Sequence, residues 1–182
     1  MRVIIVGGVA GGASAAARLR RLDEQAEIIL FERGHYISFA NCGLPYYVGD
    51  TIKDRANLLV QTPEKMRSRF NIDVRVDSEV TKIDRHAKTV EVYTHGETYS
   101  EHYDKLILAP GASPMKLPIQ GLDAENVFTL WSIPDADKVY RYLTTRDIKS
   151  AVVVGGGFVG IEMVENLVNR GIEVTLVEML DQ

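Results

Sequence analysis

The sequence has few of the features that mark secreted, membrane or nucleic-acid-binding proteins. Its 182 residues include one cysteine, which excludes an intrachain disulfide and fits a reducing compartment, so we expect a cytoplasmic protein. No apolar run approaches the roughly 20 residues that a membrane helix needs. A formal net charge of −4 provides no basic field for nucleic acid. We therefore expect neither a membrane nor a nucleic acid as a partner.

The rest of the composition is that of a globular chain. Hydrophobic residues make up 46% of it and charged residues 25%, a balance that excludes a disordered chain and allows a core to be buried. The four histidines show no metal-ligand spacing, so we predict no metal site and expect surface positions for His35, His86, His95 and His102.

The hydrophobic pattern predicts an α/β fold with two β-α-β units. The first has strands at residues 3–6 and 28–31 around a helix at 13–22, where apolar residues recur at helical spacing. The second starts with a strand at 151–154 and has its next strand at 174–177. Such units are typical of Rossmann-like parallel sheets.

The region between the two units is predicted to combine short strands with two helices. One helix is predicted at 63–70, with Thr62 as its cap and Pro63 at the first helical position, and another at 136–143. A β-rich insertion is predicted from short strands at 74–76, 80–83, 89–93 and 98–102, followed by a buried strand at 105–108. Residues 34–49 predict an ordered loop or the start of a short helix, and a linker-like stretch is marked by Pro110, Pro114, Pro118 and Pro134.

A glycine-rich turn joins the first predicted strand to its helix. It matches the dinucleotide fingerprint G-x-G-x-x-G at Gly7 and Gly12 but has Val9 in place of the middle glycine. Backbone amides in such a turn approach a pyrophosphate at the helix N-terminus. Glu32 stands twenty positions after Gly12, at the end of the next strand, where a carboxylate can accept hydrogen bonds from ribose hydroxyls. The alternative is a plain tight turn with a surface glutamate.

A second glycine turn follows the strand at 151–154. It fits the full fingerprint with Gly155, Gly157 and Gly160, and Glu178 closes the next strand eighteen positions after Gly160. An acid at that strand end favours a ribose with two hydroxyls and repels the extra phosphate of NADPH, so NADH is the predicted cofactor. The alternative is a packing turn without a ligand.

The lone cysteine, Cys42, lies between these turns in a segment rich in glycine, proline and aromatic residues. A lone cysteine is commonly a small buried hydrophobe. Here Gly43 and Pro45 favour an exposed turn, and Ser38 and Asn41 can supply polar contacts to a thiolate or its adduct. We therefore interpret Cys42 as a reactive thiol.

The order of these motifs resembles that of the pyridine nucleotide-disulfide oxidoreductases, in particular the coenzyme A-disulfide reductase group and its persulfide-reducing relatives. The resemblance extends from Met1 to Gln182. Two-cysteine relatives have a second cysteine five positions after the first, where this chain has Tyr47. The resemblance therefore implies an oxidoreductase that passes electrons from NADH through FAD to a disulfide or persulfide of coenzyme A at Cys42 alone.

The two fingerprints and the resemblance together imply a set of site residues, with Cys42 as the catalytic residue. The expected FAD contacts are Gly7, Gly8, Val9, Ala10, Gly11, Gly12, Glu32, Arg33, Asn41, Cys42, Val80, Ala109, Pro110 and Gly111. The expected NADH contacts are Gly155, Gly157, Phe158, Gly160, Glu162 and Glu178. The expected coenzyme A contacts are Ser14, Arg18, Arg21, Ser38 and Asn41.

Some of these expectations have structural alternatives. Arg18 and Arg21 lie three apart on one helical face, which is also typical of a solvated basic surface. Phe70 stands where the family can place a lysine for coenzyme A phosphate, so any charge there must come from Arg67 or Arg69. The side chains of Tyr46 and Tyr47 could cover the flavin or substrate, or serve aromatic packing.

Two alternative functions remain open at this point. NADH peroxidases and oxidases that work through a cysteine sulfenic acid carry a histidine inside the first glycine turn, where this chain has Ala10. A flavin-binding module without catalysis is the other alternative.

The expected domain organisation follows the motifs. Residues 1–112 are assigned to the first part of a Rossmann-like FAD-binding domain of the three-layer ββα type, with the β-rich insertion. Residues 113–148 are assigned to a linker and helix, and 149–182 to the start of an NAD(H)-binding domain. Because family members are several hundred residues long, we expect the chain to belong to a longer homodimeric enzyme and to be inactive alone.

Overall fold

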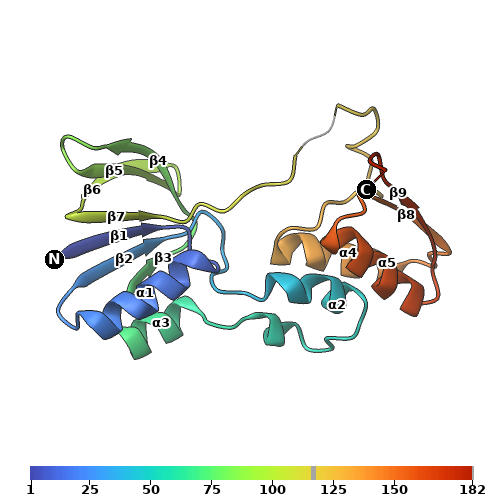
Figure 1. Ribbon diagram of the computed structural model, residues 1–182, viewed down its shortest axis with the longest axis horizontal. Helices are drawn as coiled ribbons and strands as arrows, with labels where there is room; N and C mark the ends of the chain where they lie inside the picture. The colour runs from blue at the N-terminus through green and yellow to red at the C-terminus, as the bar shows by residue number, and fades with distance from the viewer. Residues whose placement is uncertain (116–117, 182) are drawn as a thin grey trace. The chain divides into compact units, whose positions relative to one another are not determined.

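The chain divides into two compact units, which are described separately (Figure 1). The computed structural model describes residues 1–115 and 118–181. The first unit comprises Met1–Phe39 and Leu59–Ala112, and the second comprises Ala40–Leu58 and Ser113–Gln182. The segment that carries Cys42 therefore groups with the second unit, which the sequence did not predict.

The first unit has three layers. Its middle layer is a parallel sheet in the order β3-β2-β1-β7, formed by β1 (Arg2–Val6), β2 (Glu27–Phe31), β3 (Asp73–Arg75) and β7 (Lys105–Leu108). The helices α1 (Gly11–Leu22) and α3 (Pro63–Phe70) lie on one side of it (Figure 1). The antiparallel sheet of β4 (Ser78–Asp84), β5 (Thr89–Thr94) and β6 (Glu97–His102) lies on the other.

Successive side chains of a strand point to opposite faces of the sheet, and this alternation explains why the parallel sheet is covered on both sides. Val3 and Ile5 point to the helical side, where they pack with Ala16 in one core cluster. Ile4 and Phe31 point to the opposite side, where they pack with the β5 residues in another cluster. A parallel strand covered on both faces is apolar throughout. The predicted ββα arrangement of this unit is therefore confirmed.

The second unit contains the other β-α-β motif and the segment Ala40–Leu58, which carries Cys42 and is called the cysteine segment below. A parallel pair of strands, β8 (Ser150–Val154) and β9 (Glu173–Val177), is connected by α5 (Phe158–Asn169). The cysteine segment contributes a 3-10 turn at Asn41–Gly43, α2 (Leu44–Val48) and a second 3-10 turn at Arg55–Leu58. Helix α4 (Ile133–Thr145) packs against α2, as does α5.

Most of the predicted elements are confirmed, with two corrections. The strand predicted at 74–76 was placed in the insertion, but β3 lies in the main parallel sheet, with Val74 opposite Leu30, because α3 provides the crossover that a parallel strand needs. The strand at 105–108 was predicted to be buried, but β7 is an edge strand whose Leu108 is 56% exposed.

Helix boundaries follow their capping residues. Thr62 accepts a hydrogen bond from the Lys65 amide (3.3 Å) and caps α3 as predicted. Helix α4 starts one turn earlier than predicted because Ser132 and Asp135 form a capping box.

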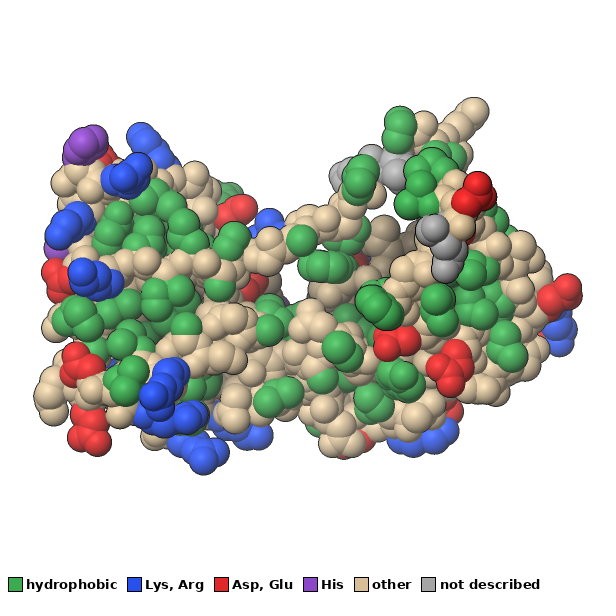
Figure 2. Space-filling view, in the orientation of Figure 1, with side chains coloured by type: hydrophobic (Ala, Val, Ile, Leu, Met, Phe, Trp, Pro, Cys, Tyr) green, Lys and Arg blue, Asp and Glu red, His purple; other side chains and the backbone are tan. Residues whose placement is uncertain are grey.

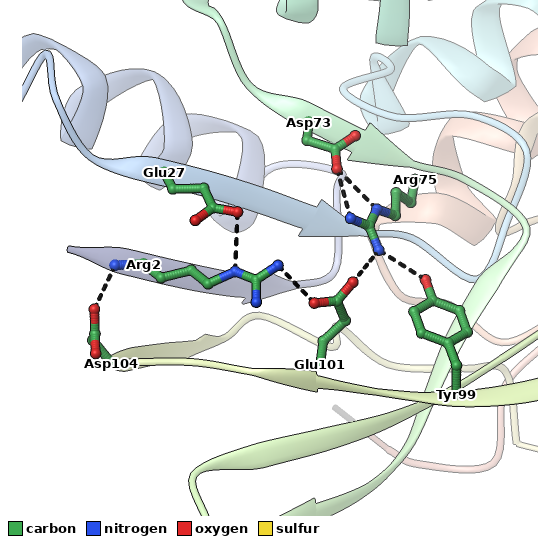
Figure 3. A network of polar contacts seen from close by, with 7 residues as sticks. All are labelled: Arg2, Glu27, Asp73, Arg75, Tyr99, Glu101 and Asp104. Carbon is green, nitrogen blue, oxygen red and sulfur yellow. Dashed lines mark hydrogen bonds and ion pairs between the residues drawn. The ribbon is translucent and has the colours of Figure 1, made fainter.

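A polar network joins the strands of the first unit (Figure 3). Glu101 on β6 accepts hydrogen bonds from Arg2 on β1 (2.7 Å) and from Arg75 on β3 (2.6 Å). Burial disfavours the charged form of Arg75, but hydrogen bonds to Glu101, Tyr99 and Asp73 raise its pKa above the ordinary value. The network ties the antiparallel layer to the parallel sheet.

The described part of the chain contains neither a candidate membrane span nor a candidate metal site. None of its helices is both long enough and apolar enough to span a bilayer. None of its His, Cys, Asp and Glu residues form a group of three or more that could hold a metal ion.

Candidate functional site

The first glycine turn is shaped by two positions that only glycine can occupy. Gly7 has a positive φ of 96°, and a Cβ on it would overlap the Ala109 carbonyl oxygen. A Cβ on Gly12 would overlap the Gly7 carbonyl oxygen. The turn therefore brings the end of β1, the start of α1 and the residue after β7 into direct contact.

Glu32 closes the same turn from the end of β2. Its Oε2 accepts a hydrogen bond from the Gly8 amide (2.8 Å), and its Oε1 accepts one from the Gly34 amide (2.8 Å). A carboxylate offers about four lone-pair sites, so both oxygens retain acceptor capacity for hydroxyl groups. Glu32 is therefore part of the turn rather than a detached surface residue.

The N-terminus of α1 has no side-chain cap. Ala10 occupies the cap position, and no acidic residue lies in the first turn. By contrast, α3 and α4 are capped by Thr62 and Ser132. An uncapped helix start directs backbone N–H groups outward, where they suit the phosphates of a dinucleotide.

The second turn repeats this geometry in the second unit. Gly155 has a φ of 104°, and a Cβ on Gly160 would overlap the Gly155 carbonyl oxygen. The Gly156 amide donates to Glu178 Oε2 (2.6 Å), as the Gly8 amide does to Glu32. Helix α5 also starts without a side-chain cap. The two turns are thus alike at both required glycines and at the acid.

Backbone donors surround the Glu178 carboxylate. Hydrogen bonds from the amides of Gly156, Leu180 and Met179 lower the pKa of Glu178. The last two amides both donate to Oε1, at 2.8 and 2.7 Å. The carboxylate is therefore a fixed negative charge at the end of β9.

The difference between the turns, Val9 against Gly157, has a physical explanation. A Cβ placed on Gly157 would have no atom within 4 Å. The turn's own packing therefore does not require a glycine at this middle position, and Val9 leaves the first turn unchanged.

Cys42 is exposed and lies in the 3-10 turn Asn41–Gly43. The Gly43 amide donates to the Ala40 carbonyl (2.9 Å) and closes this turn. A Cβ on Gly43 would come within 3.0 Å of the Leu58 side chain, so the turn packs tightly on its own segment. The exposed thiol excludes the interpretation of Cys42 as a buried hydrophobe.

Tyr47 packs rather than facing solvent. Its ring is stacked on Tyr140 of α4, with ring centroids 4.8 Å apart, and the residue is 6% exposed. Of the two roles left open for this tyrosine, the structure supports aromatic packing. Tyr46 is half-buried.

Ser38 belongs to the first unit, whereas Asn41 lies with Cys42 in the second. Ser38 has a positive φ of 42°, a conformation that is costly for a residue with a side chain. Its amide donates to the Gly8 carbonyl (2.9 Å), and its own carbonyl accepts from the Val60 amide (3.0 Å). The first bond ties Ser38 to the first glycine turn, and the second ties it to the residue after Leu59.

The predicted basic pair on α1 is accessible. Arg18, Arg21 and Ser14 are all exposed, and within residues 1–115 and 118–181 neither guanidinium has a hydrogen bond or ion pair. Lys and Arg side chains gather over the α1 and α3 side of the first unit (Figure 2). Arg20, which the sequence did not distinguish, instead donates to the Phe70 and Asn71 carbonyls (both 2.8 Å).

The other predicted contacts have different surroundings. Ala109 contacts Gly7, whereas Pro110 and Gly111 are exposed after it. Arg33 is exposed next to Glu32, and Val80 packs against the core on the β4 side. In the second unit Phe158 is 91% exposed, and the Glu162 carbonyl accepts a hydrogen bond from Asn166 (2.8 Å).

Known proteins share the sequence features described above. The family model described as pyridine nucleotide-disulphide oxidoreductase matches residues 1–182. The chain belongs to the pyridine nucleotide-disulphide oxidoreductase family. Its fold follows from this membership.

Within this oxidoreductase family, the similar proteins have related names. The coenzyme A disulfide reductase of Staphylococcus aureus strain JH9 is 40% identical over 183 residues, covering 100% of this chain and 41% of the relative. The solved structure of reduced Bacillus anthracis CoADR-RHD is 57% identical with a TM-score of 0.95, covering 100% of this chain and 33% of that one. An NAD-dependent persulfide reductase from A. fulgidus is 41% identical with a TM-score of 0.95, covering 100% and 35%. The chain thus spans about two fifths of the curated relative's length.

Sequence reasoning missed several residues that shape this oxidoreductase fold around the cysteine. Asn166 on α5 is 1% exposed, and a Cβ on Gly49 would overlap its side chain. Asp137 on α4 receives hydrogen bonds from the cysteine segment. No sequence signal distinguished these residues, because each acts through a partner far away along the chain.

Proposed function

We propose that the chain is part of an FAD-dependent enzyme that passes electrons from NADH to a disulfide or persulfide of coenzyme A at Cys42. The first unit holds FAD and the second holds NADH. FAD, when bound, would supply the redox chemistry that carries electrons from the nicotinamide to sulfur. The protein's part is to hold the two dinucleotides and to present one thiol.

The observation that carries this proposal is the repetition of one turn geometry in a chain with a single exposed cysteine. Gly7 and Gly12 correspond to Gly155 and Gly160, and each turn has a glutamate bonded to its second glycine. The two helices that follow these turns both start without a side-chain cap. This combination supports two dinucleotide sites and one thiol redox centre.

The residues of the first turn fit the adenosine end and pyrophosphate of FAD. Gly11 and Gly12 offer backbone at α1's N-terminus, and Glu32, which the Gly8 amide orients, keeps acceptor capacity for ribose hydroxyls. Arg33, Val80, Ala109 and Gly111 remain proposed contacts through the family resemblance.

The second turn supports NADH over NADPH. Glu178 stays ionised because three backbone amides lower its pKa, and a fixed carboxylate repels a ribose phosphate. Glu162 and Phe158, on the first turns of α5, are the proposed neighbours of the nicotinamide.

The substrate proposal rests on the single thiol. Tyr47 stands where two-cysteine relatives have their second cysteine, which supports an adduct between Cys42 and an external sulfur compound. Coenzyme A is the proposed carrier of that sulfur, consistent with the names of the similar reductases. Its proposed contacts are Ser14, Arg18, Arg21, Ser38 and Asn41.

Peroxide or oxygen reduction is a weaker proposal. Ala10 is exposed at the position where enzymes that use a cysteine sulfenic acid carry a histidine. A methyl group cannot transfer protons to a peroxide, so the first turn favours sulfur chemistry.

Replacement of Cys42 by serine tests the proposal. With FAD bound, the unchanged enzyme should bleach its flavin absorbance with NADH and reduce coenzyme A disulfide and persulfide. In Cys42→Ser, NADH should still bleach the flavin absorbance. Turnover should fall by about a thousandfold or more, because a hydroxyl forms no disulfide. Turnover retained by the serine variant would overturn the cysteine mechanism, and a protein that NADH never bleaches would support a non-catalytic flavin module.

Two further expectations concern the whole enzyme. We propose that it is a homodimer, which light scattering measures directly. The lone exposed thiol also supports a reducing cytoplasmic compartment, because an unpaired accessible thiol oxidises readily elsewhere.

A further inference from the structure

One carboxylate on α4 holds two parts of the cysteine segment. Asp137 Oδ1 accepts a hydrogen bond from the Tyr47 hydroxyl (3.2 Å) and another from Arg55 Nε (2.8 Å). Its Oδ2 accepts from Arg55 Nη2 (2.8 Å), which makes the arginine contact bidentate. Tyr47 lies in α2, and Arg55 begins the 3-10 turn at the other end of the segment.

These contacts are partly shielded from water. The side chains of Arg55 and Asp137 are 35% and 24% exposed, so solvent screens the pair less than a surface ion pair. Burial, followed by the negative charge of Asp137, raises the pKa of Tyr47, which therefore remains a hydrogen-bond donor at neutral pH.

The cysteine segment needs such contacts because its own secondary structure is short. Helix α2 has five residues, too few to be stable alone. The Ala40 amide donates to the Leu58 carbonyl (2.8 Å) and closes the segment at its base. Between this closure and Tyr47 lies the turn that carries Cys42.

Helix α5 also packs against α2, and two polar or close contacts from the α5 side reach the end of α2. Arg170 donates to the Val48 carbonyl (3.2 Å), and Gly49 lies against the Asn166 side chain. Asp137 differs because it joins residues from both sides of the segment through one side chain.

We propose that Asp137 is a positioning residue for Cys42, acting through Tyr47 and Arg55 to fix the turn that presents the thiol. The inference rests on the proposed function, since it assumes that the placement of this thiol matters for turnover. Asp137 takes no part in the chemistry itself.

The test compares Asp137→Ala and Asp137→Asn with the unchanged enzyme, and uses Asp147→Asn as the control. Asp147 is an exposed acid of the same unit, paired with Lys149 (2.7 Å). The rate at which iodoacetamide labels Cys42 in the absence of NADH, measured by mass spectrometry, reports the reactivity of the thiol directly. Steady-state kinetics give kcat and KM separately.

Asp137→Ala should change the Cys42 labelling rate by about fivefold or more and lower kcat for disulfide reduction by about tenfold, because small misplacements of a reacting group are costly. The KM for NADH should stay the same. For Asp137→Asn, the labelling rate and kcat should lie between those of Asp137→Ala and the unchanged enzyme, since the amide oxygen can still accept one of the bonds. Asp147→Asn should match the unchanged enzyme in both assays.

Tyr47→Phe and Arg55→Lys complete the test. Each substitution should alter the Cys42 labelling rate when made alone. When combined with Asp137→Ala, it should change that rate little further, because both residues act through the same carboxylate. If Asp137→Ala does not fold, Asp137→Asn and these two variants carry the measurement.

The outcomes separate this inference from the proposed function. An unchanged labelling rate and kcat in Asp137→Ala would overturn the positioning role alone. Turnover retained by Cys42→Ser would overturn the proposed function, whatever the labelling of the Asp137 variants. A fall in kcat that Asp147→Asn reproduces would also overturn the positioning role.

Discussion

At the residue scale, Glu32 and Glu178 have the same surroundings in their two turns. Each accepts a hydrogen bond from the amide of its turn's second glycine, and each stands at the end of the next parallel strand. Because these bonds already orient the carboxylate, little order has to be gained when a ribose binds. In the proposed function, cofactor preference would therefore depend on a carboxylate that backbone hydrogen bonds already orient.

Glu178 should determine the preference for NADH. The ratio of kcat/KM for NADH to that for NADPH should fall by about tenfold to a hundredfold in Glu178→Ala, because the repulsion of the 2′-phosphate is removed. Glu173→Ala, an exposed acid at the start of β9, is the control and should keep the ratio. Equal use of both cofactors by the unchanged enzyme would contradict this role.

The pH dependence of Glu178 follows from its lowered pKa. The folded state stabilises the charged form, so this contribution is complete above the pKa of an unfolded carboxyl, about 4.3, and is lost as pH falls through the lower folded value. Between about pH 7.5 and 8.5, where a phosphate monoester with a second pKa of about 6 is also fully charged, the preference for NADH should accordingly be constant.

Arg18 and Arg21 should matter for coenzyme A but not for inorganic polysulfide. Coenzyme A carries several phosphates, and each charge-assisted contact is worth about 1.5 to 3 kcal/mol. Replacing both arginines by alanine should raise the KM for coenzyme A disulfide by about two to four powers of ten, with a smaller effect at high salt. Arg85→Ala, an exposed arginine beyond β4, should change neither KM. Equal losses for both substrates would instead indicate a role in the fold or at FAD.

At the scale of elements, the glycine turn is the joint on which each β-α-β unit depends. The carbonyl of its first glycine points at the last glycine so closely that a methyl group cannot fit between them. This contact sets the angle at which the helix leaves the strand. The glycines that we propose to lie against a nucleotide are therefore the ones that the packing of the fold requires.

Gly12 and Gly11 provide a matched pair of substitutions. Gly12→Ala should lower the free energy of unfolding by about 1–3 kcal/mol, because its methyl group overlaps the Gly7 carbonyl oxygen. Gly11→Ala should be neutral or slightly stabilising, since its nearest neighbour, Ala109 Cβ, is 3.5 Å away. Urea unfolding of both variants measures the difference, and similar values would contradict the geometry.

At the scale of the whole molecule, the cysteine segment leaves the first unit after Phe39 and returns at Leu59. An antiparallel bridge between these two residues marks the crossing point. The segment's helix is held by α4 and α5, so the stability of the thiol's surroundings depends on the second unit.

Hydrogen exchange should reveal this dependence. Leu167→Ala, in the core of the second unit, should cost about 2–4 kcal/mol and speed exchange of the Gly49 and Thr51 amides by tenfold or more. Glu101→Ala, which removes one hydrogen-bond partner from both Arg2 and Arg75 in the first unit, should leave these amides protected. Faster exchange of these two amides in Glu101→Ala alone would contradict the assignment.

The sequence by itself determined the elements and the chemistry of each turn. Strands and helices followed from apolar periodicity, and the helix at Pro63–Phe70 followed from Thr62 and Pro63, because these signals act over a few residues. The glycines, Glu32, Glu178 and Cys42 were found for the same reason.

Only the tertiary structure decided which strands share a sheet and what holds the cysteine segment. β3 joined the parallel sheet through pairing with β2, and the edge position of β7 left Leu108 exposed. Tyr47 and Arg55 meet Asp137 across 90 and 82 positions of sequence. Contacts over such separations depend on how whole elements pack, and no local pattern of residues encodes them.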